Sequence, residues 1–544
     1  MTMESRIDPE KLLHEFGKYG KYQMRACLLI MIPAFFYSSQ MFIMGFIGQP
    51  PSFECSIIIN QPNSTISQQT YQILDNCRVL ELETNKTMQC LAVPNSTYLF
   101  DEEVPFSTLN SEFNLVCDNE HWAEHGSSLF MLGGLFTPVI TQLSDLYGRR
   151  KLMLFSLWTA TIMANICPLA PTALTFVACR FMLGVAILAI YAIMWIMCCE
   201  SVAVEFRSLI PMVYTSAWVT GIMLVGILRI WILNWRWLYF AISVPSILSA
   251  LYYWLLPESP YWSITHNKHH TIEQYIKNAC RYNNVKIDLS KCELNVRQQS
   301  DRQHKSRTLI DILRNSVALF HLCVQCYVMI SMNITYWAMA LLSTTLSEDG
   351  FTGYFLSGFI EIPGALLGVM LLFKFGRRTV TVWSFTVQCI LFLLTIFFSG
   401  TGTIQTALAV IAKFFNTFIW VAQPLMLAEM SPTTVRNIFC GTVSFFGVIG
   451  AVIAPYLPLL KTISPEAPKV TVSIVSLAAA IVLLTAPETK DLPMPEDVND
   501  FDPGRFLQLF GYQKQRKQSV FMAAENAASN HFYISSLSFE NFNL

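Results

Sequence analysis

The chain has 544 residues, of which 53% are hydrophobic and only 13% are charged, and its formal net charge is −1. Soluble globular proteins carry about 25% charged residues, so this chain has too few charges to cover a surface in water. A net charge near zero also argues against the basic footprint of a nucleic-acid-binding protein. The composition therefore predicts a protein whose outer surface faces lipid.

Apolar segments of about the 20 residues that a helix needs to cross a bilayer follow one another along the chain. The first six are expected near 26–47, 127–143, 152–169, 174–198, 209–233 and 237–256. Six more are expected near 317–342, 351–373, 380–399, 403–427, 439–460 and 470–484. We therefore predict an all-α membrane protein with twelve transmembrane helices in two six-helix bundles.

These segments divide the chain into five parts. The parts are a cytoplasmic N-terminal segment (1–25), an N-terminal six-helix bundle (26–256) that includes an extracellular loop (48–124), a cytoplasmic loop (257–316), a C-terminal bundle (317–486) and a cytoplasmic tail (487–544). Lysine and arginine gather in the loops on one side, and the positive-inside rule places that side in the cytoplasm. We expect a multi-pass plasma-membrane protein with both termini in the cytoplasm.

The long loop over 48–124 has the chemistry of an extracellular segment. It carries three sequons for N-glycosylation, at Asn63, Asn85 and Asn95. It also carries four cysteines, Cys55, Cys77, Cys90 and Cys117. In an oxidising compartment four loop cysteines predict two disulfides, and the sequence leaves all three pairings open.

Short motifs recur at equivalent places in the two halves. Asp145-Leu-Tyr-Gly-Arg-Arg150 follows the second span, and Phe375-Gly-Arg-Arg378 follows the eighth. Pro257-Glu-Ser-Pro260 follows the sixth span, and Pro487-Glu-Thr-Lys490 follows the twelfth. A receptor or scaffold needs no such symmetry, whereas a transporter uses it for two bundles that rock about a site near the bilayer midplane.

The charges in these loops predict a cytoplasmic gate. Glu200 and Arg207 close the fourth span, and Glu429 and Arg436 close the tenth with the same spacing of seven. Because seven residues are about two helical turns, each pair can lie on one face of a helix. The alternative is ordinary charge that anchors a helix end. We predict a latch formed by Asp145, Gly148, Arg149, Arg150, Glu200, Arg207, Gly376, Arg377, Arg378, Glu429 and Arg436.

These motifs are those of the major facilitator superfamily, and the chain most resembles its organic ion (cation, anion and zwitterion) transporter family. The resemblance is carried by Phe16-Gly-Lys-Tyr-Gly-Lys-Tyr-Gln23, Phe113-Asn-Leu-Val-Cys-Asp118, Asn234-Trp-Arg-Trp-Leu238, Leu356-Ser-Gly-Phe-Ile-Glu-Ile-Pro363 and Ala428-Glu-Met-Ser-Pro-Thr-Thr-Val-Arg-Asn437. It implies polyspecific transport of small organic ions by alternating access. Sugar porters share the shorter motifs, but their glutamine-rich signature is missing from the seventh span of this chain.

Ionisable and aromatic residues inside the spans predict the substrate path. A charged side chain in the membrane is costly and usually faces a cavity, which singles out Glu361 and Lys413. Aromatic rings attract organic cations, although a ring inside a span can also serve packing alone. The resemblance implies that several of these residues line the path. The predicted substrate-binding residues are Glu361, Tyr336, Tyr214, Tyr191, Trp218 and Lys413.

The chain departs from the family at its charge-selecting positions. Val448 stands where cation transporters have Asp and anion transporters have Arg, and Leu188 stands where cation members have a basic residue. We therefore expect small organic cations or weakly charged amphiphiles as substrates, with electrostatic selection that is weak or is carried by Glu361 alone against Lys413. One alternative is an anion or zwitterion transporter that uses Lys413 and Arg180. Another is a transport-inactive relative that acts as a sensor or interaction protein.

The sequence contains no nucleotide-binding loop, no metal-spaced set of His and Cys, and no nucleophile motif. We therefore predict a protein that is not an enzyme and that needs no cofactor or metal. Its expected partners are a small organic ion and the lipid bilayer, without nucleic acid, and its oligomeric state is open.

Overall fold

The computed structural model describes the chain except for residues 1–8, 18–19, 49–51, 58–70, 83–85, 94–95, 101–106, 208–209, 286–307, 347–350, 399–401, 433, 491–494, 496–497, 499–500, 510 and 512–544. Within the described residues, eleven helical stretches are long and apolar enough to cross a membrane. The shorter apolar helix Ala467–Leu483 lies where the twelfth span is predicted. The helices therefore follow the twelve predicted segments in order.

The first six spans form a bundle over residues 21–255, here called the N-bundle. Its elements are α2 (Lys21–Met31), α3 (Pro33–Phe42), α4 (Met44–Ile47), α7 (His121–Leu132), η3 (Gly133–Phe136), α8 (Thr137–Tyr147), α9 (Arg149–Ile166), η4 (Cys167–Leu169), α10 (Ala173–Ser201), α12 (Ile210–Trp231), α13 (Trp235–Ser243), η5 (Val244–Leu251) and α14 (Tyr252–Leu255).

The last six spans form the C-bundle over residues 316–483. Its elements are α18 (Ser316–Leu346), α19 (Phe351–Phe359), α20 (Glu361–Lys374), α21 (Arg377–Phe397), α22 (Gly402–Met430), α23 (Arg436–Ile453), η9 (Ala454–Thr462) and α24 (Ala467–Leu483). Short helices outside the bundles are α1 (Pro9–Glu15), α6 (Leu109–Glu112), α11 (Val204–Arg207), α15 (Pro260–Thr265), α16 (His269–Asn283), α17 (Leu309–Arg314) and α25 (Gly504–Leu509).

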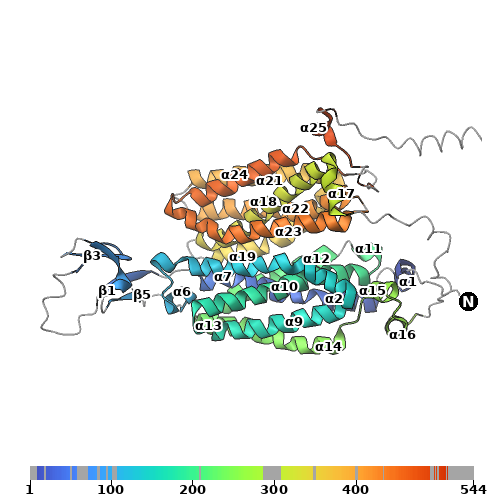
Figure 1. Ribbon diagram of the computed structural model, residues 1–544, viewed down its shortest axis with the longest axis horizontal. Coiled ribbons are helices and arrows are strands. Elements are labelled where there is room, and N and C mark those ends of the chain that lie inside the picture. Colours follow the sequence, from blue (N-terminus) through green and yellow to red (C-terminus); the bar gives the residue numbers. More distant parts are fainter. Residues whose placement is uncertain are drawn as a thin grey trace, which may run out of the picture.

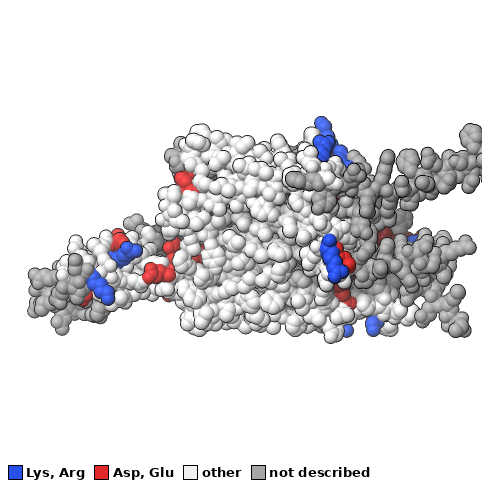
Figure 2. Space-filling view, turned by 45° about the horizontal axis from the view of Figure 1, so that its top comes forward, with Lys and Arg blue, Asp and Glu red and all other residues white. Residues whose placement is uncertain are grey.

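The two bundles lie side by side, with small structures at each end (Figure 1). One end carries the strands of the long loop and is here called the disulfide end. The other end carries α1, α15 and α16 and is here called the basic end, because the Gly-Arg-Arg motifs lie there. On the face shown in Figure 2, charged side chains gather toward these two ends and leave an uncharged belt between them. Such a belt is what a surface in contact with lipid needs.

The long loop folds into two small antiparallel sheets. Strand β1 (Phe53–Ile57) pairs with β5 (Ser96–Phe100), and β3 (Arg78–Glu81) lies between β2 (Tyr71–Ile73) and β4 (Lys86–Gln89). Its four cysteines form the disulfides Cys55–Cys90 and Cys77–Cys117, which selects one of the three pairings that the sequence leaves open. The sequons at Asn63, Asn85 and Asn95 lie outside the described residues.

Proline sets the break that positions the central charged residue. In the eighth span α19 ends at Phe359 and α20 begins at Glu361, with Pro363 as its third residue. Because proline has no N–H, it cannot continue the hydrogen-bond ladder back to Phe359. Glu361 consequently lies in the first turn of a new helix, where the helix dipole favours a carboxylate.

Segments on either side of the bundles pack onto the basic end. Glu10 of α1 forms an ion pair with Arg207 of α11 at 3.4 Å. At the other side, Phe501 packs against Phe439 with ring centroids 5.6 Å apart. The beginning of the predicted C-terminal tail is thus packed against the C-bundle.

Candidate substrate path and charge clusters

Aromatic rings from both bundles meet at the centre of the molecule. We call this set the central aromatic cluster, formed by Tyr37, Phe42, Tyr191, Tyr214, Trp218, Tyr336, Trp337 and Trp420. In the N-bundle, Tyr37 lies edge-on to Trp218 with centroids 5.0 Å apart. In the C-bundle, Tyr336 lies edge-on to Trp420 at 5.2 Å. The two groups touch through Trp218 and Trp337 at 6.3 Å, so the cluster spans the seam between the bundles.

A chain of polar contacts runs from this cluster to the predicted charged residues. Trp218 donates its indole N–H to the Tyr336 hydroxyl at 2.9 Å, and that hydroxyl donates to Glu361 Oε1 at 3.0 Å. The Lys413 ammonium lies 3.0 Å from the same oxygen and donates to Ser357 Oγ at 2.8 Å. The side chains of Lys413 and Glu361 are only 2% and 6% exposed.

The sequence predicts electrostatic selection that is weak or carried by Glu361 alone against Lys413, and the structure joins these two residues in one buried ion pair. Such a pair is not a large source of stability, because desolvation offsets most of the attraction. Removing one partner alone, however, leaves a buried charge uncompensated. An ion that binds here would therefore meet an ion pair and not a free carboxylate.

The two departures at Val448 and Leu188 lie against the same glycine. A Cβ placed on Gly134 of η3 would lie 2.9 Å from Val448 Cγ2 and 3.2 Å from Leu188 Cδ1. Val448 belongs to the C-bundle and Leu188 to the N-bundle, so apolar side chains from both bundles approach this glycine. Neither of the two selecting positions carries a charge.

Arg180, a candidate for anion binding in one alternative, makes its contacts within the N-bundle. Its guanidinium is fully buried, donates to the Gln40 carbonyl at 2.7 Å and lies over the Phe130 ring at 4.4 Å. A further hydrogen bond of 3.3 Å reaches the Tyr239 hydroxyl. These contacts make Arg180 a connector of helices inside the N-bundle.

The first predicted gate becomes a charge cluster within the N-bundle. Arg149 donates to Glu200 at 2.9 Å and also pairs with Asp145. Glu200 accepts a 2.7 Å hydrogen bond from Ser259. The Arg150 backbone N–H donates to Glu258 at 2.9 Å. The second, third and fourth spans and the segment after the sixth are thereby tied together at the basic end.

The C-bundle repeats this cluster with equivalent residues. Arg377 donates to Glu429 at 2.8 Å, and Glu429 accepts from Thr489 at 2.7 Å. The Arg378 backbone N–H donates to Glu488 at 3.2 Å. The Glu-Ser and Glu-Thr steps of the repeated motifs thus supply two residues to each cluster, a role that their recurrence in the sequence could have indicated.

The predicted pairs at a spacing of seven do not form. Glu200 binds Arg149 whereas Arg207 binds Glu10 and donates to the Cys199 carbonyl, because α10 ends at Ser201 and Arg207 lies on α11. Similarly, Glu429 binds Arg377, whereas Arg436 donates to the Ser431 carbonyl. A helix break between the members of each pair removes the shared face on which that prediction depended.

Two glycines leave room for the acidic members of the clusters. Gly148 has a φ of 111°, a left-handed conformation that glycine adopts readily, and a Cβ there would lie 2.9 Å from Glu258 Oε2. A Cβ at Gly376 would overlap the Glu488 carboxylate. Both predicted gate glycines therefore allow the loop backbone to approach a carboxylate.

Sequence reasoning missed several members of the central site. Tyr37 and Phe42 on the first span, Trp420 on the tenth and Ser357 on the eighth were not among the predicted residues. Aromatic and serine residues are common in spans, so composition alone gave no signal for them. Only the contacts with Trp218, Tyr336 and Lys413 distinguish them.

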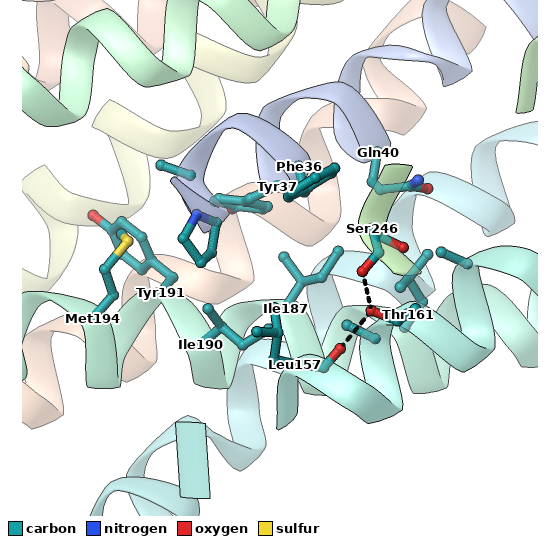
Figure 3. A pocket seen from close by; sticks show the side chains of 15 residues that line it. Phe36, Tyr37, Gln40, Leu157, Thr161, Ile187, Ile190, Tyr191, Met194 and Ser246 are labelled. Carbon is teal, nitrogen blue, oxygen red and sulfur yellow. Dashed lines mark hydrogen bonds between the residues drawn. The ribbon is translucent and has the colours of Figure 1, made fainter. Parts of the chain in front are cut away.

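A cavity of about 30 Å³ lies inside the N-bundle, with Tyr37 and Tyr191 on its wall (Figure 3). Thr161 and Ser246 provide polar groups farther along it, joined by a 3.2 Å hydrogen bond from Thr161 to the Ser246 carbonyl. Its lining contains no charged residue. The buried charges of Glu361 and Lys413 lie at the central cluster and not in the lining of this cavity.

Comparison with known proteins identifies the family. A family model described as "Sugar (and other) transporter" matches residues 63–500. The chain belongs to this family. It is therefore a membrane transporter and not an enzyme, as the sequence predicts.

Comparison with individual proteins shows which members of this family the chain is similar to. The transporter is 26% identical to the organic cation transporter protein of Drosophila melanogaster, across 90% of this chain and 94% of that protein. It is also 26% identical to solute carrier family 22 member 7 of Mus musculus, across 91% and 97% of the two chains. The predicted likeness to organic ion transporters is confirmed.

In fold, the transporter resembles the xylose transporter XylE from E. coli in a partially occluded, inward-open conformation. The TM-score is 0.59 at 13% identity, and the match covers 87% of this chain and 99% of that chain. Such distant likeness speaks to the fold alone. It confirms the predicted major facilitator fold of two six-helix bundles.

Proposed function

We propose that this transporter moves small organic cations across the plasma membrane by alternating access, with the central aromatic cluster and Glu361 as the binding site. The observation that carries the proposal is the buried carboxylate of Glu361, which accepts a hydrogen bond from Tyr336 of the aromatic cluster that both bundles form. Ring faces attract organic cations by about 0.5–2 kcal/mol each. The relative named as an organic cation transporter supports the same substrate class.

We further propose that the disulfide end is extracellular and that both termini are cytoplasmic. The disulfides of the long loop support this orientation, because such bonds persist in oxidising compartments. The Gly-Arg-Arg motifs at the basic end support it through the positive-inside rule.

In this orientation the bundles meet at the extracellular side. His125 of the N-bundle contacts the Tyr456 hydroxyl of the C-bundle at 2.8 Å, and Ser128 donates to the Val452 carbonyl at 2.9 Å. The main charge clusters at the basic end, around Arg149 and Arg377, each join residues of one bundle. This arrangement supports an outward-closed state, and we propose that the clusters exchange partners across the bundles when the outer side opens.

Uptake measurements test the substrate class. Cells that express the transporter are given radiolabelled tetraethylammonium, an organic anion, a zwitterion and a neutral solute, and surface protein is quantified in parallel. We expect saturable cation uptake that is lost in Glu361→Gln and kept in the exposed control Glu273→Gln. Anion uptake that survives Glu361→Gln would contradict the proposal and favour Lys413 as the selecting group. No uptake of any solute, at normal surface level, would favour a transport-inactive relative.

A further inference from the structure

The ammonium of Lys413 occupies the kind of environment that an organic cation seeks. It lies 3.0 Å from the Glu361 carboxylate, 5.3 Å from the centre of the Tyr336 ring and 5.7 Å from that of Phe42. The two rings come from different bundles, and the ammonium is nearly fully buried between them and the acid. A ring face and a carboxylate around one cation are the elements of a cation site. Here the chain's own lysine fills it.

We propose that Lys413 is a tethered competitor, which holds the cation subsite when the transporter is empty and must withdraw before a substrate cation binds Glu361. This inference rests on the proposed function, because it assigns a role within the same site. It makes Lys413 a specificity-determining residue, in contrast to its predicted role as a ligand for substrate.

A place for the withdrawn ammonium lies next to its present position. A crevice of about 10 Å³ is lined by Lys413 together with Met339, Gly353, Ser357, Thr406, Ala409 and Val410. That volume is close to the roughly 10–15 Å³ that one water needs. Lys413 already donates to Ser357 at 2.8 Å, and Thr406 adds a hydroxyl to the crevice wall. The long flexible stem of lysine allows this small shift while its charge stays solvated by hydroxyl groups.

The exchange also reaches the seam between the bundles. Glu361 Oε1 accepts both the Lys413 ammonium and the Tyr336 hydroxyl, and Tyr336 in turn accepts from Trp218 across the seam. A substrate cation that replaces the ammonium therefore acts on the same carboxylate oxygen that holds this bridge. Lys413 links the charge state of the site to the contact between the halves.

The thermodynamic consequence is a reduced apparent affinity. A site that is competent for only a fraction of the time binds with its dissociation constant divided by that fraction. If Lys413 vacates the subsite about one tenth of the time, substrate affinity is lowered about tenfold. Removing the ammonium should remove this penalty.

The test compares Lys413→Met with Lys413→Arg and the wild type, using radiolabelled tetraethylammonium and quantified surface protein. Methionine fills similar space without charge, whereas arginine keeps the charge and its planar fork suits a carboxylate. We expect KM for tetraethylammonium to fall about tenfold in Lys413→Met and to stay equal or rise in Lys413→Arg. A mere structural role for Lys413 would weaken binding in both variants, so a gain of affinity separates the two roles.

Lys413→Met leaves Glu361 buried without its partner and can therefore fold poorly. A second measurement tests the inference in that case. Tetraethylammonium is added to purified protein and the shift in thermal unfolding is recorded. We expect a larger shift in Lys413→Met than in the wild type, because the cation supplies the missing charge. An equal or smaller shift, or an unchanged or higher KM, would overturn the inference.

The inference and the proposed function fail in different ways. Cation uptake by the wild type with an unchanged KM in Lys413→Met would leave the function standing and exclude the competitor. Uptake that appears only in Lys413→Met would support the competitor. No cation uptake or thermal shift in any variant would contradict both.

Discussion

Trp218 of the N-bundle and Tyr336 of the C-bundle are joined by a 2.9 Å hydrogen bond from the indole N–H to the phenol oxygen. Both side chains are buried, and Tyr336 passes the contact on to Glu361 at 3.0 Å. The seam between the halves and the charged centre therefore share one hydroxyl group. A change at this hydroxyl should affect both substrate binding and the contact that keeps the bundles together.

Tyr336→Phe tests this bridge. The substitution keeps the ring but leaves the Trp218 N–H without its acceptor, and an unsatisfied buried group costs about 1–3 kcal/mol. We expect KM for tetraethylammonium to rise about tenfold, since Glu361 loses the donor that orients it. Uptake kinetics at equal surface level measure the effect. Tyr327→Phe, on the same helix but outside this chain of contacts, is the control, and equal behaviour of the two variants would exclude the bridge.

Val448→Asp tests the apolar contact at Gly134. A carboxylate there would lie beside Gly134 in the seam, and an unpaired charge in this half-buried apolar position is destabilising. We expect a strong loss of surface protein and a lower melting temperature. The double variant Val448→Asp with Leu188→Lys should recover part of both, because the two positions lie against the same glycine. Additive losses in the double variant would mean that the two side chains do not interact.

Arg377→Ala tests the cluster of the C-bundle. Arg377 and Glu429 are 18% and 14% exposed, so the loss of the arginine leaves a largely buried carboxylate and a cost on the order of 2–3 kcal/mol. We expect a lower melting temperature and reduced maximal uptake, with Glu429→Gln restoring part of the stability when combined with Arg377→Ala. Lys374→Ala, an exposed neighbour at the same end, should behave like the wild type. If Arg377→Ala left the melting temperature and the maximal uptake unchanged, the cluster would contribute neither to stability nor to transport.

The lowered pKa of Glu112 predicts a pH effect on the docking of the long loop. Burial raises the pKa of Glu112, but hydrogen bonds from Arg236 and Trp235 outweigh it and hold the pKa below its usual 4.5. A carboxyl with a lowered folded-state pKa stabilises the fold above its unfolded value, and this contribution is lost as the pH falls through the lowered pKa. We therefore expect the protection of the loop amides against hydrogen exchange, relative to the intrinsic rate at each pH, to fall below about pH 4.5.

Glu112→Gln is the matched variant for this effect. It should exchange faster at neutral pH and show little further change on acidification, whereas Glu54→Gln in the same loop should keep the wild-type profile. An unaltered acid response in Glu112→Gln would assign the effect to other carboxyl groups.

The twelve spans could be read from the sequence, because a helix in lipid must satisfy its own backbone and cover itself with apolar side chains. The same constraint makes intramembrane charge rare, so Glu361 and Lys413 were identifiable as candidates. The duplicated Gly-Arg-Arg and Pro-Glu motifs likewise indicated two related halves. These properties are local, and each is carried by a single stretch of chain.

Pairing was decided by the tertiary structure. Glu361 and Lys413 are 52 residues apart, and only the packing of α20 against α22 makes them one ion pair. The clusters at the basic end show the same dependence on packing. The spacing predicts a pair of Glu200 with Arg207, but α10 ends at Ser201, and Glu200 pairs with Arg149 instead. The disulfide pairing and the approach of Val448 and Leu188 to Gly134 also depend on long-range packing. Which segments are apolar enough to span a membrane follows from the local sequence. Which residue pairs with a given charge depends on which helices the fold packs together.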